Sequence, residues 1–159
     1  SKPYPPSTLA EVKIFDGAFD SLDKIRSLGY KTFIITNQPD VSRGITSELE
    51  VNKINNFIQN RLLIDDVYTC FHDDADLCSC RKPLPGAILL LSKKFDINLE
   101  MSFMVGDRWR DIEAGKAANC KTVLIENSYD ERKADNPDYV VKSLDEVAML
   151  IYRLNRKID

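Results

Sequence analysis

Long hydrophobic runs, a strong excess of one charge and internal repeats are all missing from this 159-residue chain. No apolar run approaches the ~20 residues that a membrane-spanning helix needs, so the sequence predicts no membrane protein. Lysine and arginine total 22, aspartate and glutamate total 25, and the net charge is -3. This balance predicts no nucleic-acid-binding surface. The hydrophobic fraction of 43% excludes a disordered or fibrous chain.

A secretory signal and a disulfide framework are also missing. The first ten residues carry three prolines and no apolar segment, which predicts no signal peptide. Only four cysteines are present, and three of them lie within eleven residues of one another. A secreted disulfide scaffold would spread more cysteines over a smaller chain. We therefore expect a cytoplasmic protein whose residues 1–159 form one compact domain.

The apolar periodicity and the turn residues predict strands that alternate with helices. Strands are expected at 31–36, 66–70, 102–105, 122–125 and 139–141. Helices are expected at 17–28, from 47 onward, from 85 to about 95, after 107 through 118, and from 143 to about 154. This alternation predicts an α/β fold: a Rossmann-like three-layer sandwich with a mostly parallel sheet. In such sheets, ligands bind beyond the carboxyl ends of the strands.

The most specific local pattern is formed by Cys70, His72, Cys78 and Cys80. Three thiolates and one imidazole at this spacing suit a tetrahedral Zn²⁺ ion. Because protein side chains fill all four positions, the metal is expected to be structural, in a small loop insertion at about 70–80. The alternative is a group of reduced cysteines that happen to be adjacent. Cys120 lies outside this set and is expected to be a small buried hydrophobe.

Two carboxylates surround the end of a predicted strand. Asp107 ends the strand, and Asp111 lies one turn into the following helix, so both can face one cleft. Such a pair suits Mg²⁺, which prefers oxygen ligands. Alternatively, Asp107 is an N-cap and Asp111 is a first-turn acid that the helix dipole favours. Trp109, between them, is either a packing residue or a substrate platform.

Other polar side chains follow neighbouring strands. Lys82 can neutralise charge during phosphoryl transfer, and Arg81 can bind a phosphate with two hydrogen bonds. Thr36 and Asn37 supply a hydroxyl and an amide that suit phosphate oxygens, and Arg43 can reach the same cleft from the next loop. Alternatively, Arg81 and Lys82 are a solvated basic pair, and Thr36 and Asn37 belong to an ordinary turn.

Together these residues resemble the haloacid dehalogenase-type phosphatases, in the right order over nearly the whole chain. Thr36-Asn37 matches the second motif of the family, and Lys82 matches the third. Gly106-Asp107 with Asp111 matches the fourth. The segments TNQPDVSRG at 36–44 and CRKPLPG at 80–86, with the cysteine and histidine pattern between them, narrow the resemblance to the histidinol-phosphatase-like branch.

This resemblance implies Mg²⁺-dependent hydrolysis of a small phosphorylated metabolite through an aspartyl-phosphate, and a structural zinc. Thr36 and Asn37 would bind the phosphoryl group, and Lys82 would neutralise it. Asp107 would bind Mg²⁺, and Asp111 would support that site. The arginines expected to bind substrate are Arg43, Arg81 and Arg108. Heptose 1,7-bisphosphate ranks first as substrate because no second domain is fused to the chain, and histidinol phosphate is the alternative.

One departure concerns the first motif of the family, an Asp-x-Asp pair on a central strand. No such pair follows a predicted strand here; Asp16 begins a helix, and Asp74 and Asp76 lie inside the zinc loop. We expect an N-terminally incomplete copy of a longer enzyme, inactive alone. The alternatives are a partner chain that fills the gap, as in a dimer or a strand-swapped assembly, and a sheet that closes up.

Two other functions stay open from the sequence. The first is a non-catalytic phosphate-binding or scaffold protein, which the missing motif favours and the retained Lys82, Asp107 and Asp111 oppose. The second is a phosphorylatable receiver-type domain, which is also α/β. A receiver domain places its acidic pair early in the chain and its lysine late, whereas here Lys82 precedes Asp107. A receiver domain is also not expected to contain a zinc loop.

Overall fold

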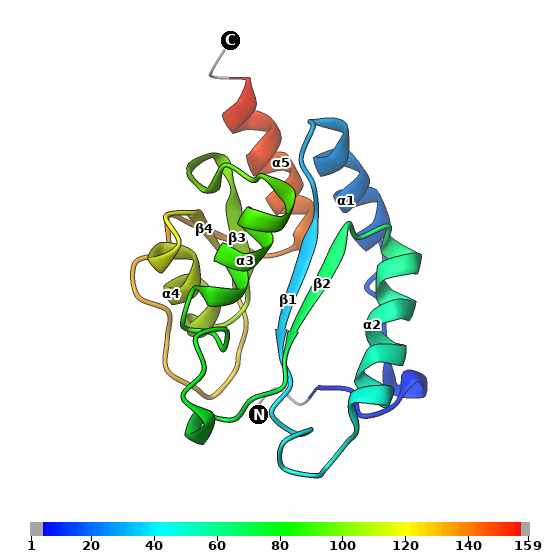
Figure 1. Cartoon of the computed structure of the whole chain (residues 1–159). Coiled ribbons are helices and arrows are strands. Elements are labelled where there is room, and N and C mark those ends of the chain that lie inside the picture. The colour runs from blue at the N-terminus through cyan, green and yellow to red at the C-terminus, as the bar shows by residue number, and fades with distance from the viewer. Residues whose placement is uncertain (1–4, 157–159) are drawn as a thin grey trace.

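The computed structural model describes residues 5–156, along which strands and helices alternate (Figure 1). The strands are β1 (Phe33–Asn37), β2 (Asp66–Cys70), β3 (Phe103–Gly106), β4 (Lys121–Ile125) and β5 (Tyr139–Val141). The helices are α1 (Ala18–Ser27), α2 (Glu48–Leu62), α3 (Gly86–Phe95), α4 (Trp109–Ala117) and α5 (Leu144–Asn155). This order confirms the predicted α/β fold. None of the helices in the described residues could cross a membrane.

The strands form two parallel sheets instead of one continuous sheet. One sheet has the order β1-β2, and the other has the order β3-β4-β5. Within residues 5–156, β1 and β3 are therefore both end strands with a single partner. The suggestion that the remaining strands close up is wrong for these residues, because β1 does not pair with β3.

Side chains, and not strand pairing, hold the two sheets together. Ile35 of β1 and Met104 of β3 both pack against a buried cluster from α3 and α4. The buried members of this cluster are Ile88, Ala114 and Ala118. At the other ends of the strands, the ring of Tyr30 packs edge-on against Phe103, with ring centroids 5.8 Å apart. Apolar packing between side chains thus takes the place of a hydrogen-bonded ladder.

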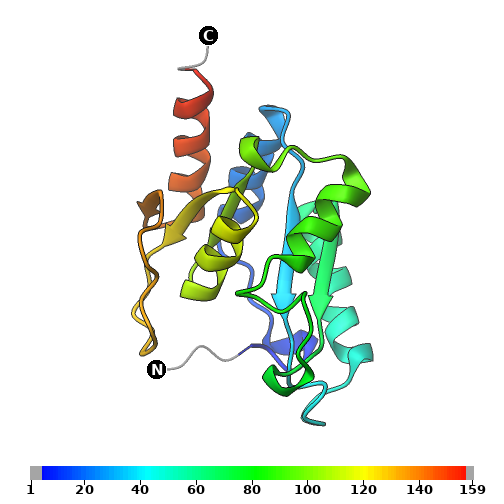
Figure 2. The same ribbon diagram turned by 60° about the vertical axis from the view of Figure 1, so that its left-hand side comes forward.

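The helices cover both faces of the strands, which confirms the three-layer architecture (Figure 2). On one face, Ile25 of α1 and Val147 of α5 pack with Val123 of β4 in a buried core. Ala18 of α1 and Leu62 of α2 continue that layer over the β1-β2 sheet. Helices α3 and α4 lie on the opposite face (Figure 2).

The helix boundaries follow local signals in the sequence. Ser47 and Ser143 precede α2 and α5, and each hydroxyl accepts a hydrogen bond from the backbone N–H three residues later. Pro85 stands at the N-cap of α3, where its missing N–H costs no hydrogen bond. Gly29 follows α1 with a φ of 88°, a conformation that favours glycine.

Close packing between β3 and α4 depends on Gly106, the last residue of β3. A Cβ built at Gly106 would lie 2.3 Å from the Cβ of Asp111 in the first turn of α4. A second glycine, Gly115, makes a similar contact, since its Cβ would lie 2.5 Å from the Cβ of Met104. These glycines let α4 lie against the sheet and bring Asp111 to the end of β3.

We predict that Gly106→Ala lowers the free energy of unfolding by about 1–3 kcal/mol, because the added methyl group must displace Asp111. Urea denaturation followed by circular dichroism measures this change. Val140→Ala is the control, because the side chain of Val140 is half exposed on β5 and its loss should change stability little. Equal stability of Gly106→Ala and the wild type would contradict the tight packing.

Candidate functional site

Lys82 lies between the two sheets, beyond the carboxyl ends of β1 and β3. Its Nζ donates a hydrogen bond to the carbonyl of Ile35, at 2.6 Å, and lies 2.7 Å from Oδ1 of Asp111. The side chains of Lys82 and Asp111 are only 12% and 9% exposed. Because water screens such a pair weakly, the attraction between the two charges is strong. The structure therefore brings together the lysine and the second aspartate that the sequence identified.

Asn37 fixes the backbone of Lys82. Its Nδ2 donates to the carbonyl of Lys82 at 3.0 Å, and its Oδ1 accepts from the N–H of Lys82 at 3.1 Å. These two bonds use the amide, so in this structure Asn37 positions the lysine. The hydroxyl of Thr36 accepts a hydrogen bond from Gln38 Nε2 at 3.1 Å, and within residues 5–156 it donates none, so its proton can serve a ligand.

Asp111 has two partners, because it closes the first turn of α4 as well as pairing with Lys82. Its Oδ2 accepts a hydrogen bond from the backbone N–H of Arg108 at 3.1 Å. The alternative in which Asp107 caps this helix is wrong, since Arg108 occupies the N-cap position. Asp111 is thus a first-turn acid that also pairs with Lys82.

Asp107 is held by the segment that joins β4 to β5. Its Oδ2 accepts a hydrogen bond from the hydroxyl of Tyr129 at 2.9 Å, and its carbonyl accepts one from the amide of Asn127. The bond to Asp107 raises the pKa of Tyr129, because the carboxylate stabilises the protonated phenol. One carboxylate oxygen of Asp107 can still bind a cation such as Mg²⁺, which prefers oxygen ligands.

The same segment holds Arg108. Nε and Nη2 of its guanidinium contact the carboxylate of Glu131 at 3.0 and 2.5 Å. This pairing raises the pKa of Arg108. Asn127, Tyr129 and Glu131 match no motif in the sequence, although they follow β4, whose carboxyl end lies at the same edge as that of β3. The strand-end rule, applied to β4 as well, would have identified them.

The cysteine and histidine side chains predicted to bind metal do come together. The Sγ–Sγ distances are 3.7 Å for Cys70–Cys78, 3.6 Å for Cys78–Cys80 and 3.2 Å for Cys70–Cys80. All exceed the roughly 2.05 Å of a disulfide. Two of them match the edge of about 3.7 Å that a tetrahedron with Zn–S bonds of roughly 2.3 Å requires. His72 Nδ1 lies 3.4 Å from Cys80 Sγ, so all four donor atoms can surround one ion.

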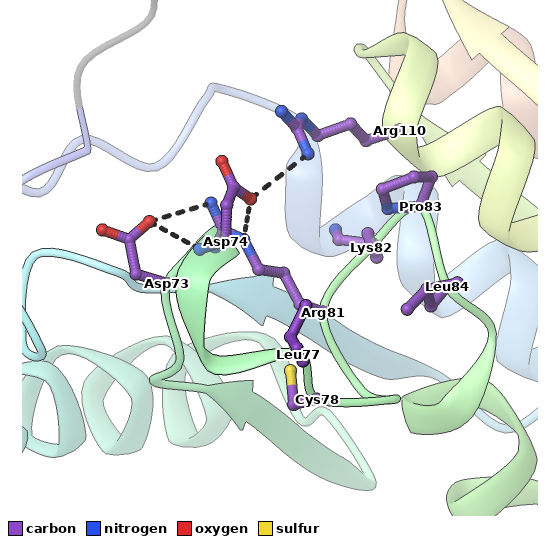
Figure 3. A pocket seen from close by; sticks show the side chains of 9 residues that line it. All are labelled: Asp73, Asp74, Leu77, Cys78, Arg81, Lys82, Pro83, Leu84 and Arg110. Atoms are coloured by element: carbon purple, nitrogen blue, oxygen red, sulfur yellow. Dashed lines mark hydrogen bonds and ion pairs between the residues drawn. The ribbon is translucent and has the colours of Figure 1, made fainter.

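Ion pairs hold the aspartates of this cysteine and histidine loop. Arg43, from the loop after β1, contacts both carboxylate oxygens of Asp73, at 2.6 and 2.7 Å. Arg81 donates to Oδ1 of Asp74 at 2.7 Å (Figure 3) and to the carbonyl of His72 at 3.2 Å. The hydrogen bond from Arg43 is the largest cause that lowers the pKa of Asp73 to about 2.

We predict that Arg43→Gln raises the pKa of Asp73 from about 2 toward the ordinary value near 3.9. Because the pKa is lower in the folded state, the stabilisation is present above about pH 4 and is lost as the pH falls through about 2. Carboxyl ¹³C shifts, followed by NMR as a function of pH, measure this pKa. Arg61→Gln on the exposed side of α2 is the charge-matched control, and an unshifted titration in Arg43→Gln would contradict the pairing.

Comparison with known proteins places the chain in a family. Residues 5–125 match the haloacid dehalogenase-like hydrolases. A D-glycero-beta-D-manno-heptose-1,7-bisphosphate 7-phosphatase of Helicobacter pylori is 38% identical over 115 residues, which cover 69% of this chain and 66% of that protein. The chain therefore spans slightly less than two thirds of this relative. The enzyme of the same name from Pasteurella multocida is 32% identical over 157 residues, or 89% of this chain and 84% of that protein.

A solved structure has the same fold. It is the D,D-heptose 1.7-bisphosphate phosphatase from B. bronchiseptica complexed with magnesium and phosphate. The TM-score is 0.79 at 23% sequence identity, and the superposition covers 93% of this chain and 88% of that one. With the family match and the Pasteurella multocida relative, the arrangement of Thr36, Lys82, Asp107 and Asp111 leads to one conclusion. The chain belongs to the haloacid dehalogenase-like hydrolases.

Proposed function

We propose that this chain provides the phosphate site of a phosphatase that acts on a small phosphorylated sugar, with heptose 1,7-bisphosphate as the favoured substrate. The observation that carries the proposal is the position of Lys82, whose ammonium lies between the carbonyl of Ile35 and the carboxylate of Asp111. A cation fixed at this point can neutralise a phosphate bound beside Thr36. The names of the relatives support the choice of a heptose bisphosphate.

Each residue has a role that its contacts support. Thr36 donates its hydroxyl proton to a phosphate oxygen, and Lys82 attracts the phosphate charge. Asn37 and Asp111 hold the backbone and the ammonium of Lys82 in place. The carboxylate of Asp107 fits Mg²⁺ as a hard oxygen ligand held in orientation by Tyr129. Mg²⁺, when bound, supplies charge neutralisation and orientation of the phosphate.

The nucleophile is the part that these 159 residues do not supply. Asp74 and Asp76 form a short turn inside the cysteine and histidine loop, and Asp16 precedes α1, so none of them stands at the end of a strand. We propose that the chain alone has no phosphatase activity. An Asp-x-Asp pair has to come from an added strand, which can pair with the unpartnered side of β1 or β3.

We also propose that Cys70, His72, Cys78 and Cys80 bind a structural Zn²⁺ ion. Cys70 is buried at the end of β2, and Cys80 immediately precedes Arg81 and Lys82. A metal bound to both cysteines closes the loop and fixes the direction in which the chain leaves toward Lys82. Burial raises the pKa of the Cys70 thiol, and a cation bound there would favour its thiolate form.

We predict that Cys78→Ala abolishes stoichiometric zinc binding, whereas Cys120→Ala retains about one zinc per chain. Cys120 is a suitable control because it is the one cysteine outside the cluster and is partly buried against α3 and α4. Elemental analysis measures the zinc. Chelation should lower the melting temperature of the wild type and of Cys120→Ala, since bound zinc stabilises the native state. An unchanged melting temperature after demonstrated zinc removal would contradict a structural role.

We predict that phosphate release from heptose 1,7-bisphosphate with Mg²⁺ occurs only after the chain is extended by a first strand that carries Asp-x-Asp. The control extension has the same strand with Asn-x-Asn, which lacks the nucleophile and should restore no activity. Histidinol phosphate serves as the second substrate and tests the choice of sugar phosphate.

Turnover by the 159-residue chain, with contaminants excluded, would contradict the proposed inactivity. If the Asp-x-Asp extension folds but hydrolyses neither substrate, the phosphatase proposal fails and a non-catalytic phosphate-binding protein is favoured. Binding of inorganic phosphate, measured on the same extended chain, would then support that second function.

A further inference from the structure

A pocket of about 150 Å³ lies beside Lys82, between the cysteine and histidine loop and the start of α4 (Figure 3). Its lining includes the charged side chains of Arg81, Lys82 and Arg110 with aspartates of the loop, and the apolar side chains of Leu77 and Leu84. A small organic molecule with an anionic end matches such a lining, because apolar side chains can contact its carbon skeleton.

Arg110 differs from the other arginines around this pocket. Arg43, Arg81 and Arg108 each donate hydrogen bonds to carboxylates. Within residues 5–156, Arg110 donates no hydrogen bond to another residue; its closest carboxylate is that of Asp74, at 3.9 Å. That distance is too long for a hydrogen bond, so the N–H donors of Arg110 are free for a ligand.

The position of Arg110 is nevertheless defined. Its guanidinium carbon lies 4.7 Å from the centre of the Trp109 ring, a cation–π contact that holds the side chain over the indole. Its side chain is only 29% exposed. Asp74, by contrast, is 66% exposed and already accepts a hydrogen bond from Arg81. A ligand can therefore bind Arg110 without breaking a protein hydrogen bond.

The ion pairs around the pocket leave Arg110 as the cation with the most distant carboxylate. Four cationic side chains line the pocket or contact its aspartates: Arg43, Arg81, Lys82 and Arg110. Within residues 5–156, their carboxylate partners are Asp40, Asp73, Asp74 and Asp111. The first three cations each lie 2.7 Å or less from a carboxylate oxygen, whereas Arg110 lies 3.9 Å from one. The planar guanidinium of Arg110 matches a phosphate group geometrically, since two parallel N–H donors meet two oxygens.

We infer that Arg110 is a specificity-determining residue that binds a second phosphate of the substrate, while Lys82 and Thr36 bind the first. This inference rests on the proposed phosphatase function and deepens it. It favours substrates with a phosphate at each end. A phosphorylated amino alcohol such as histidinol phosphate carries an ammonium group instead of a second phosphate, so Arg110 would not attract its other end.

The chain contains a natural reporter of this binding, because Trp109 is its single tryptophan. Both Arg110 and Arg132 lie over the indole, with guanidinium carbons 4.7 and 4.4 Å from the ring centre. When Arg110 turns toward a phosphate, the surroundings of the indole change and its fluorescence should change too. The affinity itself is measured independently by isothermal titration calorimetry, with zinc-loaded protein and Mg²⁺ in the buffer.

The test compares inorganic phosphate, a hexose monophosphate and heptose 1,7-bisphosphate as ligands of the 159-residue chain. The wild type should bind the bisphosphate about tenfold or more tightly than the monophosphate, and only the bisphosphate should change the fluorescence strongly. Arg110→Gln should lose this preference and keep its affinity for the monophosphate. Arg132→Gln is the matched control, because it removes the other guanidinium that lies over Trp109 and should keep the preference.

The outcomes separate this inference from the proposed function. If Arg110→Gln keeps the full preference, the role of Arg110 is wrong and the phosphate site stands. If the wild type binds none of the three ligands, both proposals fail. Arg110→Lys provides a second variant if Arg110→Gln does not fold; it retains the charge without the planar fork, and undiminished preference in it would contradict the paired hydrogen bonds.

Discussion

The structure depends on one interaction, the contact of the Lys82 ammonium with both halves of the molecule. On one side, Nζ bonds to the carbonyl of Ile35 in β1, and on the other it pairs with Asp111 in α4. Because no strand pairing joins β1 to β3, this buried contact supplements the apolar packing that connects the two sheets. Removing one partner of such a pair leaves an unpaired buried charge, which costs about 3–5 kcal/mol. The group that suits phosphate binding therefore also stabilises the fold.

Lys82 is positioned by two loops that are joined to each other by polar contacts. Asn37 binds both backbone groups of Lys82, which fixes the start of the lysine side chain relative to the end of β1. The salt bridge from Arg43 to Asp73 then ties the loop after β1 to the cysteine and histidine loop, and Arg81 pairs with Asp74 inside that region. A single surface ion pair contributes little to stability. Several ion pairs that share the neighbouring Asp73 and Asp74 can together favour one arrangement of the loops. The site is thus held by hydrogen bonds between segments that have little apolar core of their own.

Much of the fold could be predicted because its signals are local. The boundaries of β2 and β5 match the prediction, and the serine caps at Ser47 and Ser143 follow from side chains within three residues. The cluster of Cys70, His72, Cys78 and Cys80 was also predictable, since its members lie within eleven residues of one another. The division into two sheets could not be predicted, because it depends on partners distant in the sequence. The free guanidinium of Arg110 and the bond between Tyr129 and Asp107 likewise arise only when separate segments meet.

The hydrogen-bonding capacity of Lys82 connects the fold to the proposed chemistry. A lysine ammonium has three N–H donors, and here two of them have partners, at 2.6 and 2.7 Å. One donor therefore remains for a phosphate oxygen or for a carboxylate on an added strand. The two existing contacts approach from β1 and α4, so they also fix the direction of the third. An added strand that pairs with the unpartnered side of β1 would enter beside this donor. The open strand edge and the positive charge that the proposed reaction needs therefore meet at Lys82.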